Sequence, residues 1–171
     1  TLLDDKGRRI FWGWIREQGP ATNGWGSVAS LPRVLSLAAD KTLRIEPAPE
    51  LETLRQNHRR LSNIAIAGNT EVPLDEVRGD CLELTVTFDP GSAAAFGVKV
   101  RRSPDGAEET AVVCAPAEKA LYVDFSKSAP NEPVRYPAMD SRYARDHGIP
   151  ESEWFTTRQS APFELATGEP L

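Results

Sequence analysis

The sequence predicts an all-β protein made of short antiparallel strands, and two observations carry that prediction. Residues 81–88 alternate between apolar and polar types, so that four apolar side chains share one face: Leu82, Leu84, Val86 and Phe88. Residues 96–101 repeat the alternation, and the turn signature Ser103-Pro104-Asp105-Gly106 follows them. Alternation interrupted by turn residues is typical of antiparallel strands that bury one face.

The first fifty residues predict one antiparallel unit of about four strands. Segment 8–16 is rich in aromatic and β-branched residues, which favours a strand. A second run covers 24–31 and 33–37 and is broken by Pro32, as an edge strand or a bulge would be. Residues 42–46 add a short strand after a turn. Together these strands make most of a unit like one blade of a β-propeller.

The chain changes character at Pro47-Ala48-Pro49, where two prolines predict a stiff hinge. Residues 50–57 then predict a helical turn. Beyond the strands at 81–88 and 96–101, further strands are expected at 109–113 and 120–125. Strands at this spacing with one apolar face predict an antiparallel β-sandwich.

Residues 126–160 break the strand rhythm. Four prolines and scattered charges in this stretch predict a long excursion, with one helical turn near 141–146. Strand character returns at 161–165.

The composition is that of a globular chain and argues against several kinds of partner. Of the 171 residues, 40% are hydrophobic and 26% are charged, and the net charge of −5 disfavours nucleic acid and anionic membranes as partners. No apolar run approaches the roughly 18 to 20 residues that span a bilayer. Since the chain starts at Thr1 without Met, we expect a segment of a longer protein. The sequence decides neither a secreted nor a cytoplasmic location.

The two cysteines leave two alternatives open. Cys81 and Cys114 either face each other as a disulfide or are two small buried hydrophobic residues. Cysteine usage therefore does not decide the redox compartment.

Five segments carry a resemblance to a known family: GRRIFWGW at 7–14, GW at 24–25, SLPR at 30–33, PELETLR at 49–55, and APFEL with GEPL at 161–171. In this order they resemble the end of the catalytic domain and the following domain in glycoside hydrolase family 32, the invertases, inulinases, levanases and fructosyltransferases. Residues 121–128 also resemble a family stretch, although Arg usually stands where this chain has Phe125.

The resemblance implies a division of the chain. Residues 1–48 would form the last blade of a five-bladed β-propeller, 49–60 a linker helix, and 61–171 an incomplete antiparallel β-sandwich. The intact enzyme would act on sucrose or fructans by a retaining mechanism through a fructosyl-enzyme intermediate, without a cofactor.

The family's catalytic motifs are absent from these 171 residues. An Asn-Asp-Pro-Asn nucleophile segment, an Arg-Asp-Pro segment and a Glu-Cys acid/base segment would all lie upstream, so we expect no catalytic residue in this chain. The alternative hypothesis is a free-standing carbohydrate-binding or dimerisation module built on a β-sandwich.

Other candidates for chemistry have plainer explanations. A retaining glycosidase needs two carboxyl groups about 5 to 5.5 Å apart. Asp4 with Asp5 suits a turn, Glu50 with Glu52 suits a helix start, and Glu151 with Glu153 lies in a polar loop. The two histidines, His58 and His147, are far apart and lack other ligands at metal-binding spacing, so no metal site is expected.

The tryptophans are the features with functional promise. Trp12 and Trp14 are two residues apart on one predicted strand and therefore share a side. In the resembling family this strand follows an active-site segment, so Trp14 is the candidate substrate-binding residue and Trp12 is expected to fill packing. Trp25 and Trp154 are interpreted as packing anchors. Open strand edges and exposed tryptophans near the amino end predict self-association.

Overall fold

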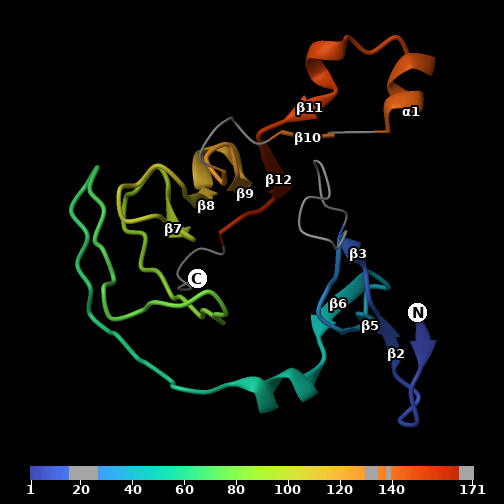
Figure 1. Ribbon diagram of the computed structural model, residues 1–171, viewed down its shortest axis with the longest axis horizontal. Helices are drawn as coiled ribbons and strands as arrows, with labels where there is room; N and C mark the ends of the chain where they lie inside the picture. Colours follow the sequence, from blue (N-terminus) through green and yellow to red (C-terminus); the bar gives the residue numbers. More distant parts are fainter. Residues whose placement is uncertain (16–26, 130–134, 138–139, 166–171) are drawn as a thin grey trace. The chain divides into compact units, whose positions relative to one another are not determined.

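The computed structural model describes residues 1–15, 27–129, 135–137 and 140–165, and it divides into two compact units, Thr1–Ser62 and Asn63–Leu171 (Figure 1). Strands dominate both units, and the described residues contain one short α-helix and three 3-10 helices. The predicted all-β class is therefore confirmed.

The first unit is built on a four-stranded antiparallel sheet in the order β1-β2-β5-β6. Its strands are β1 (Leu2–Leu3), β2 (Arg9–Phe11), β5 (Arg33–Leu37) and β6 (Leu43–Pro47). Ile10, in the middle of β2, is the buried residue of this sheet. Gly7 has φ 73° in the β1–β2 turn, a left-handed conformation that glycine adopts without steric cost.

The strand expected over 8–16 is divided in two, which corrects the prediction of one continuous strand. After β2 the chain leaves the sheet and forms β3 (Trp14–Ile15), which pairs with β4 (Val28–Ala29). Gly13 marks the change: its N–H donates to Ser30 Oγ at 2.8 Å, and its carbonyl accepts from the Ser30 N–H at 2.7 Å. Ser30 thus takes both backbone groups of Gly13 away from the first sheet.

The predicted helical turn is present as the 3-10 helix η1 (Pro49–Leu54). Pro49 suits its first position because the missing N–H would have no partner there. The Ala48 side chain is buried, and the Ala48 N–H donates to the Pro32 carbonyl at 3.0 Å. The proline hinge is therefore fastened to the first unit by a backbone hydrogen bond.

The second unit contains a four-stranded antiparallel sheet in the order β12-β9-β8-β7. Its strands are β7 (Phe96–Val100), β8 (Thr110–Ala115), β9 (Ala120–Asp124) and β12 (Arg158–Pro162). The 3-10 helix η2 (Pro116–Glu118) connects β8 to β9, and Lys119 turns the chain with φ 49°. The register places apolar side chains on one face: Phe96, Val98, Val112, Cys114, Leu121 and Val123.

The strand predicted at 81–88 is wrong. Residues 55–95 contain no strand, and every side chain from Cys81 to Thr87 is exposed. Phe88 alone is half-buried, with its ring centroid 5.1 Å from that of Phe96. The physical reason is that a period-two pattern specifies which side chains face a core, whereas a strand also needs a partner backbone for its hydrogen bonds.

A helical excursion separates β9 from β12, and Figure 1 shows it in orange. It contains β10 (Tyr136–Pro137), α1 (Ser141–Asp146), η3 (Glu151–Glu153) and β11 (Phe155–Thr156), and β10 pairs with β11. The predicted turn at 141–146 is confirmed as α1. Asp140 caps it, since Oδ1 accepts from the N–H groups of Arg142 and Tyr143 at 2.9 and 3.0 Å. The last strand lies at 158–162 rather than at 161–165.

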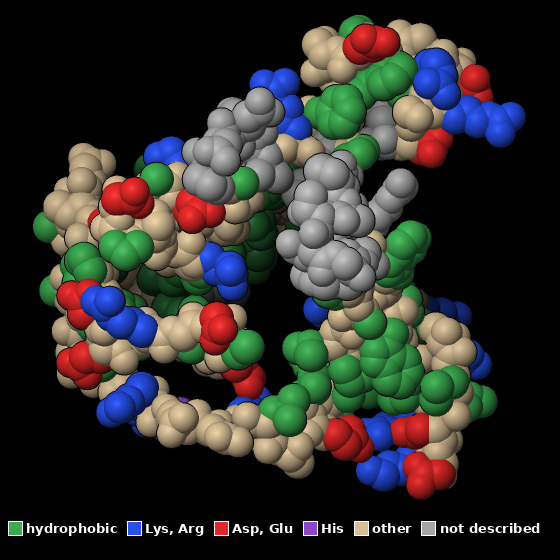
Figure 2. All heavy atoms as spheres, in the orientation of Figure 1, with side chains coloured by type: hydrophobic (Ala, Val, Ile, Leu, Met, Phe, Trp, Pro, Cys, Tyr) green, Lys and Arg blue, Asp and Glu red, His purple; other side chains and the backbone are tan. Residues whose placement is uncertain are grey.

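Many large apolar side chains are exposed in both units, and Figure 2 shows them gathered on the surface over the first unit. Trp12 is 44% exposed and Trp14 73%, so the prediction of exposed tryptophans near the amino end is confirmed for these two. Trp25 lies outside the described residues. Within the described ranges, no helix has the length and apolarity to cross a membrane.

Candidate functional site

Trp14 lies on β3, where it pairs with Ala29 of β4. Ile15 and Val28 pair with each other and are also exposed, but side chains alternate along a strand, so they lie on the opposite face from Trp14. Trp14 therefore presents an exposed indole surface beside Ala29. Such a surface packs well against the C–H face of a sugar, because both surfaces are apolar and the electron-rich ring face attracts the C–H groups. The structure leaves this face free among the described residues of the first unit.

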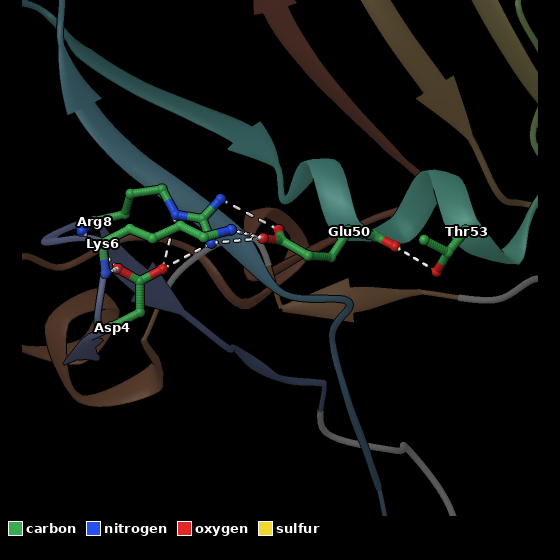
Figure 3. A network of polar contacts seen from close by, with 5 residues as sticks. All are labelled: Asp4, Lys6, Arg8, Glu50 and Thr53. Atoms are coloured by element: carbon green, nitrogen blue, oxygen red, sulfur yellow. Dashed lines mark hydrogen bonds and ion pairs between the residues drawn. The ribbon is translucent and has the colours of Figure 1, made fainter.

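A polar cluster fastens η1 to the β1–β2 turn, and we call it the Arg8 clamp: Asp4, Lys6, Arg8 and Glu50 (Figure 3). Arg8 Nε donates to Asp4 Oδ2 at 2.7 Å. On the other side, Arg8 Nη2 and Nη1 donate to the two carboxylate oxygens of Glu50 at 2.7 and 3.2 Å. Lys6 Nζ adds a third contact to Glu50 at 3.1 Å. One guanidinium thus bridges two carboxylates 46 positions apart in the sequence, from Asp4 to Glu50.

The clamp keeps both of its carboxylates ionised. The Arg8 side chain, then the Glu50 backbone N–H and Lys6, lower the pKa of Glu50 to about 2. Partial desolvation raises the pKa of Asp4, but hydrogen bonds from the Arg8 backbone and side chain outweigh it and leave that pKa below its ordinary value. The two carboxylates in turn raise the pKa of Arg8.

This electrostatic arrangement does not suit glycosidic bond cleavage. A retaining enzyme needs one carboxyl group whose raised pKa keeps it protonated as the acid. Asp4 and Glu50 both have lowered pKa values and both have an arginine partner, so neither serves as a general acid. Sequence reasoning paired Asp4 with Asp5 and Glu50 with Glu52. It missed the Asp4–Arg8–Glu50 arrangement because the pairing depends on how η1 returns to the turn.

The remaining candidates in the second unit have structural partners. Trp154 Nε1 donates to the Ile149 carbonyl at 2.8 Å, which agrees with its interpretation as a packing anchor. His147 stacks on Tyr143 with ring centroids 4.0 Å apart. Across the described part of the chain, no group of three or more metal-ligating side chains comes together.

A second charged cluster surrounds Glu109, the buried charged side chain of the second unit. In this Glu109 cluster the carboxylate meets Lys99 Nζ at 2.9 Å, Arg102 Nε at 3.3 Å and Lys127 Nζ at 3.8 Å. Lys99 Nζ also contacts Glu71 at 2.7 Å, and the hydrogen bonds that Lys99 donates to Glu71 and Glu109 raise its pKa. Sequence reasoning did not single out any of these residues. The cluster ties the strandless segment that carries Glu71 to the edge strand β7.

A comparison with models of protein families shows which family the chain belongs to. The family model described as the C-terminal part of glycosyl hydrolases family 32 matches residues 50–170. Since that match covers more than half of the 171 residues, the chain belongs to this family.

Individual relatives agree with the assignment. The chain is 35% identical over 130 residues to a levanase of Bacillus subtilis, which covers 71% of this chain and 19% of the levanase. It is 31% identical over 97 residues to beta-fructofuranosidase 1 of Zea mays, covering 53% of this chain and 14% of that protein. An acid, vacuolar beta-fructofuranosidase 1 of a Rosa hybrid cultivar is 28% identical over 172 residues, covering 83% of this chain and 28% of the relative. The chain therefore spans between about a seventh and just over a quarter of the length of these relatives. No solved structure matches it.

Proposed function

We propose that this chain is the C-terminal portion of a hydrolase that acts on β-fructofuranosides, either sucrose or fructans. The observation that carries the proposal is the family match over residues 50–170, together with relatives whose names include a levanase and several fructofuranosidases. In the intact enzyme two carboxyl groups outside this chain perform the retaining reaction. This portion has a structural role and no catalytic residue.

The organisation proposed for the portion follows its two units. The antiparallel sheet β1-β2-β5-β6 is what one propeller blade requires, which supports residues 1–48 as the last blade. Residues 49–60, including η1, act as the linker. The sheet β12-β9-β8-β7 with its apolar face supports residues 61–171 as part of a β-sandwich.

Trp14 is proposed as a wall of the substrate site. Its 73% exposure leaves the indole face available to a sugar, and its partner strand β4 holds it from one side only. In the intact enzyme, Trp14→Ala should lower kcat/KM for sucrose about tenfold, as the loss of one aromatic contact of about 1.4 kcal/mol would. Trp12→Ala is the matched control and should change stability rather than kinetics. Equal kinetics for the Trp14 variant and the wild type, measured at low temperature, would remove Trp14 from the site.

The absence of catalytic residues is tested by activity. Purified residues 1–171 should release no fructose from sucrose, inulin or levan above a heat-treated control, whereas the intact protein should release it. Fructose release by the isolated chain would contradict the proposed role, and inactivity of the intact protein on all three sugars would contradict the proposed function.

The open edges of both sheets support self-association as a property of this portion. Strand β6 is an edge strand whose five residues are all exposed. Leu43 and Ile45 on this strand add apolar surface next to unpaired backbone groups. Exposed edge strands of this kind pair with other chains.

A further inference from the structure

A hollow of about 360 Å³ lies in the helical excursion of the second unit, between η3 and the two-stranded sheet β10-β11. Six residues line it: Arg135, Glu151, Ser152, Phe155, Thr156 and Thr157. Its volume falls within the range of roughly 300 to 1,000 Å³ that small-molecule sites occupy. It is also separate in sequence from Trp14 and from the Arg8 clamp.

The lining combines one aromatic ring with uncommitted polar groups. Phe155 is 52% exposed, so a large part of its ring is open to a ligand. Within the described ranges, no hydrogen bond or ion pair engages the side chains of Arg135, Glu151 or Ser152. An aromatic face beside one cation, one carboxylate and one hydroxyl matches a sugar ring, whose C–H face is apolar and whose hydroxyls both donate and accept hydrogen bonds.

The hollow is held in shape by hydrogen bonds on each side. At η3, the N–H groups of Glu153 and Trp154 donate to the carbonyls of Pro150 and Glu151 at 2.9 and 3.1 Å. At the other side, the Phe125 N–H donates to the Thr157 carbonyl at 3.0 Å. Thr156 Oγ1 donates to the Arg158 carbonyl at 2.5 Å. A site whose backbone is already fixed loses less entropy when a ligand binds.

A second hollow in the same unit is less suited to a sugar. It has about 400 Å³ and lies at the ends of β9 and β12, but no aromatic side chain lines it. Its charged groups are already paired, Glu118 with Arg158 at 3.2 Å and Lys119 with Glu164 at 2.9 Å. A ligand there would have to break these pairs and would gain no stacking surface.

We propose that the hollow at Phe155 binds a sugar unit of a fructan chain and so serves as a non-catalytic carbohydrate site. Phe155 stacks on the ring, while Arg135 and Glu151 bond to its hydroxyls. Because Arg135 and Glu151 carry opposite charges, the lining has no net charge from this pair and favours a neutral polyhydroxylated ligand over an anion. The choice of a fructan rests on the proposed function, whereas the sugar chemistry rests on the lining itself.

The test is affinity electrophoresis of the 171-residue chain through native gels that contain levan, inulin or dextran. Levan or inulin should retard the wild type, and dextran should not. Phe155→Ala should weaken the apparent affinity about tenfold, because it removes the stacking surface. Tyr143→Ala is the matched control, since Tyr143 is 53% exposed on α1 and does not line the hollow. This control should bind as the wild type does.

Circular dichroism shows whether the Phe155 variant keeps its fold. If it does not, Arg135→Ala replaces it, because Arg135 is exposed and holds no partner in the described structure. Unretarded wild type, wild-type retardation of the folded hollow variant (Phe155→Ala, or Arg135→Ala in its place), or an equal loss in the Tyr143 control would each overturn the sugar site. Retardation by dextran as strong as by levan would overturn its assignment to fructans. Fructose release by the intact protein is a separate readout. A result against sugar binding in the hollow can therefore be distinguished from a result against the proposed function.

Discussion

Replacement of Glu109 by glutamine is the sharpest test of what stabilises the second unit. Glu109 is 8% exposed, and three cations face its carboxylate within 4 Å. Glu109→Gln keeps the size and shape of the side chain and removes its charge. The cations then retain the cost of partial desolvation without the carboxylate that offsets it.

The magnitude follows from how deeply the partners are buried. Breaking a fully buried ion pair costs about 3–5 kcal/mol. Here the side chains of Lys99, Arg102 and Lys127 are 35%, 46% and 63% exposed, so they can turn back into water after the substitution. The loss is therefore closer to that of one charge-assisted hydrogen bond with a partly desolvated partner. We expect the free energy of unfolding to fall by about 2 kcal/mol.

Urea unfolding at low protein concentration, followed by the fluorescence of Trp154 and the other tryptophans, measures this loss as a shift of the midpoint at unchanged slope. Glu108→Gln is the control, since it removes the same charge from the adjacent residue outside the cluster and should change stability by less than about 0.5 kcal/mol. If Glu109→Gln also stays within about 0.5 kcal/mol of the wild type, the Glu109 cluster does not stabilise the unit.

Three further outcomes are expected. Cys81 is exposed, whereas Cys114 is buried and burial raises the pKa of its thiol. A thiol reagent should therefore modify Cys81 quickly and Cys114 only on unfolding, and Cys81→Ser should remove the fast phase. The folded pKa of Glu50 is about 2 and its ordinary value is 4.5, so the stabilisation from the Arg8 clamp should be complete above about pH 4.5 and be lost as the pH falls toward 2. An NMR titration of Glu50 should give a midpoint near 2, and this midpoint should rise in Arg8→Met. An unchanged midpoint in the variant would contradict the clamp. Sedimentation of the isolated chain should show association that grows with concentration, whereas a monomer at every concentration would rule out pairing at open edges.

The elements that could be predicted from sequence are those fixed by neighbouring residues. The helical turn at 141–146 was found at the same positions as α1, because Asp140 and the helix-forming residues that follow it act locally. The strands expected at 96–101, 109–113 and 120–125 lie within two residues of β7, β8 and β9. The first of these has an alternating pattern followed by the turn at 103–106, and the second is a run of β-branched and other apolar residues.

The features that sequence reasoning missed depend on contacts between distant residues. Residues 81–88 carry the clearest alternation in the chain, yet they form no strand, because alternation does not specify a hydrogen-bonding partner. The Arg8–Glu50 pairing joins residues 42 positions apart, and the Lys99–Glu71 contact reaches from β7 into the strandless segment. Nothing in the local sequence at either end indicates such a partner. Five of the residues that line the hollow at Phe155 lie within positions 151–157, but Arg135 joins them only through the pairing of β10 with β11.

In the described residues the buried polar side-chain groups all have hydrogen-bond partners, whereas many apolar side chains are not buried. This difference bears on the proposed role. No buried side-chain nitrogen or oxygen in the described part of the chain lacks a hydrogen-bond partner. Large apolar side chains, by contrast, are widely exposed, with Trp14 and Leu37 at 73% and 70%. One or two hydrogen-bond partners satisfy a polar group, whereas burying an apolar face requires a second layer packed across it. Because exposed apolar surface of this extent marks a binding or packing interface, the contacts that the chain still needs are hydrophobic, which supports its proposed role as one portion of a larger hydrolase.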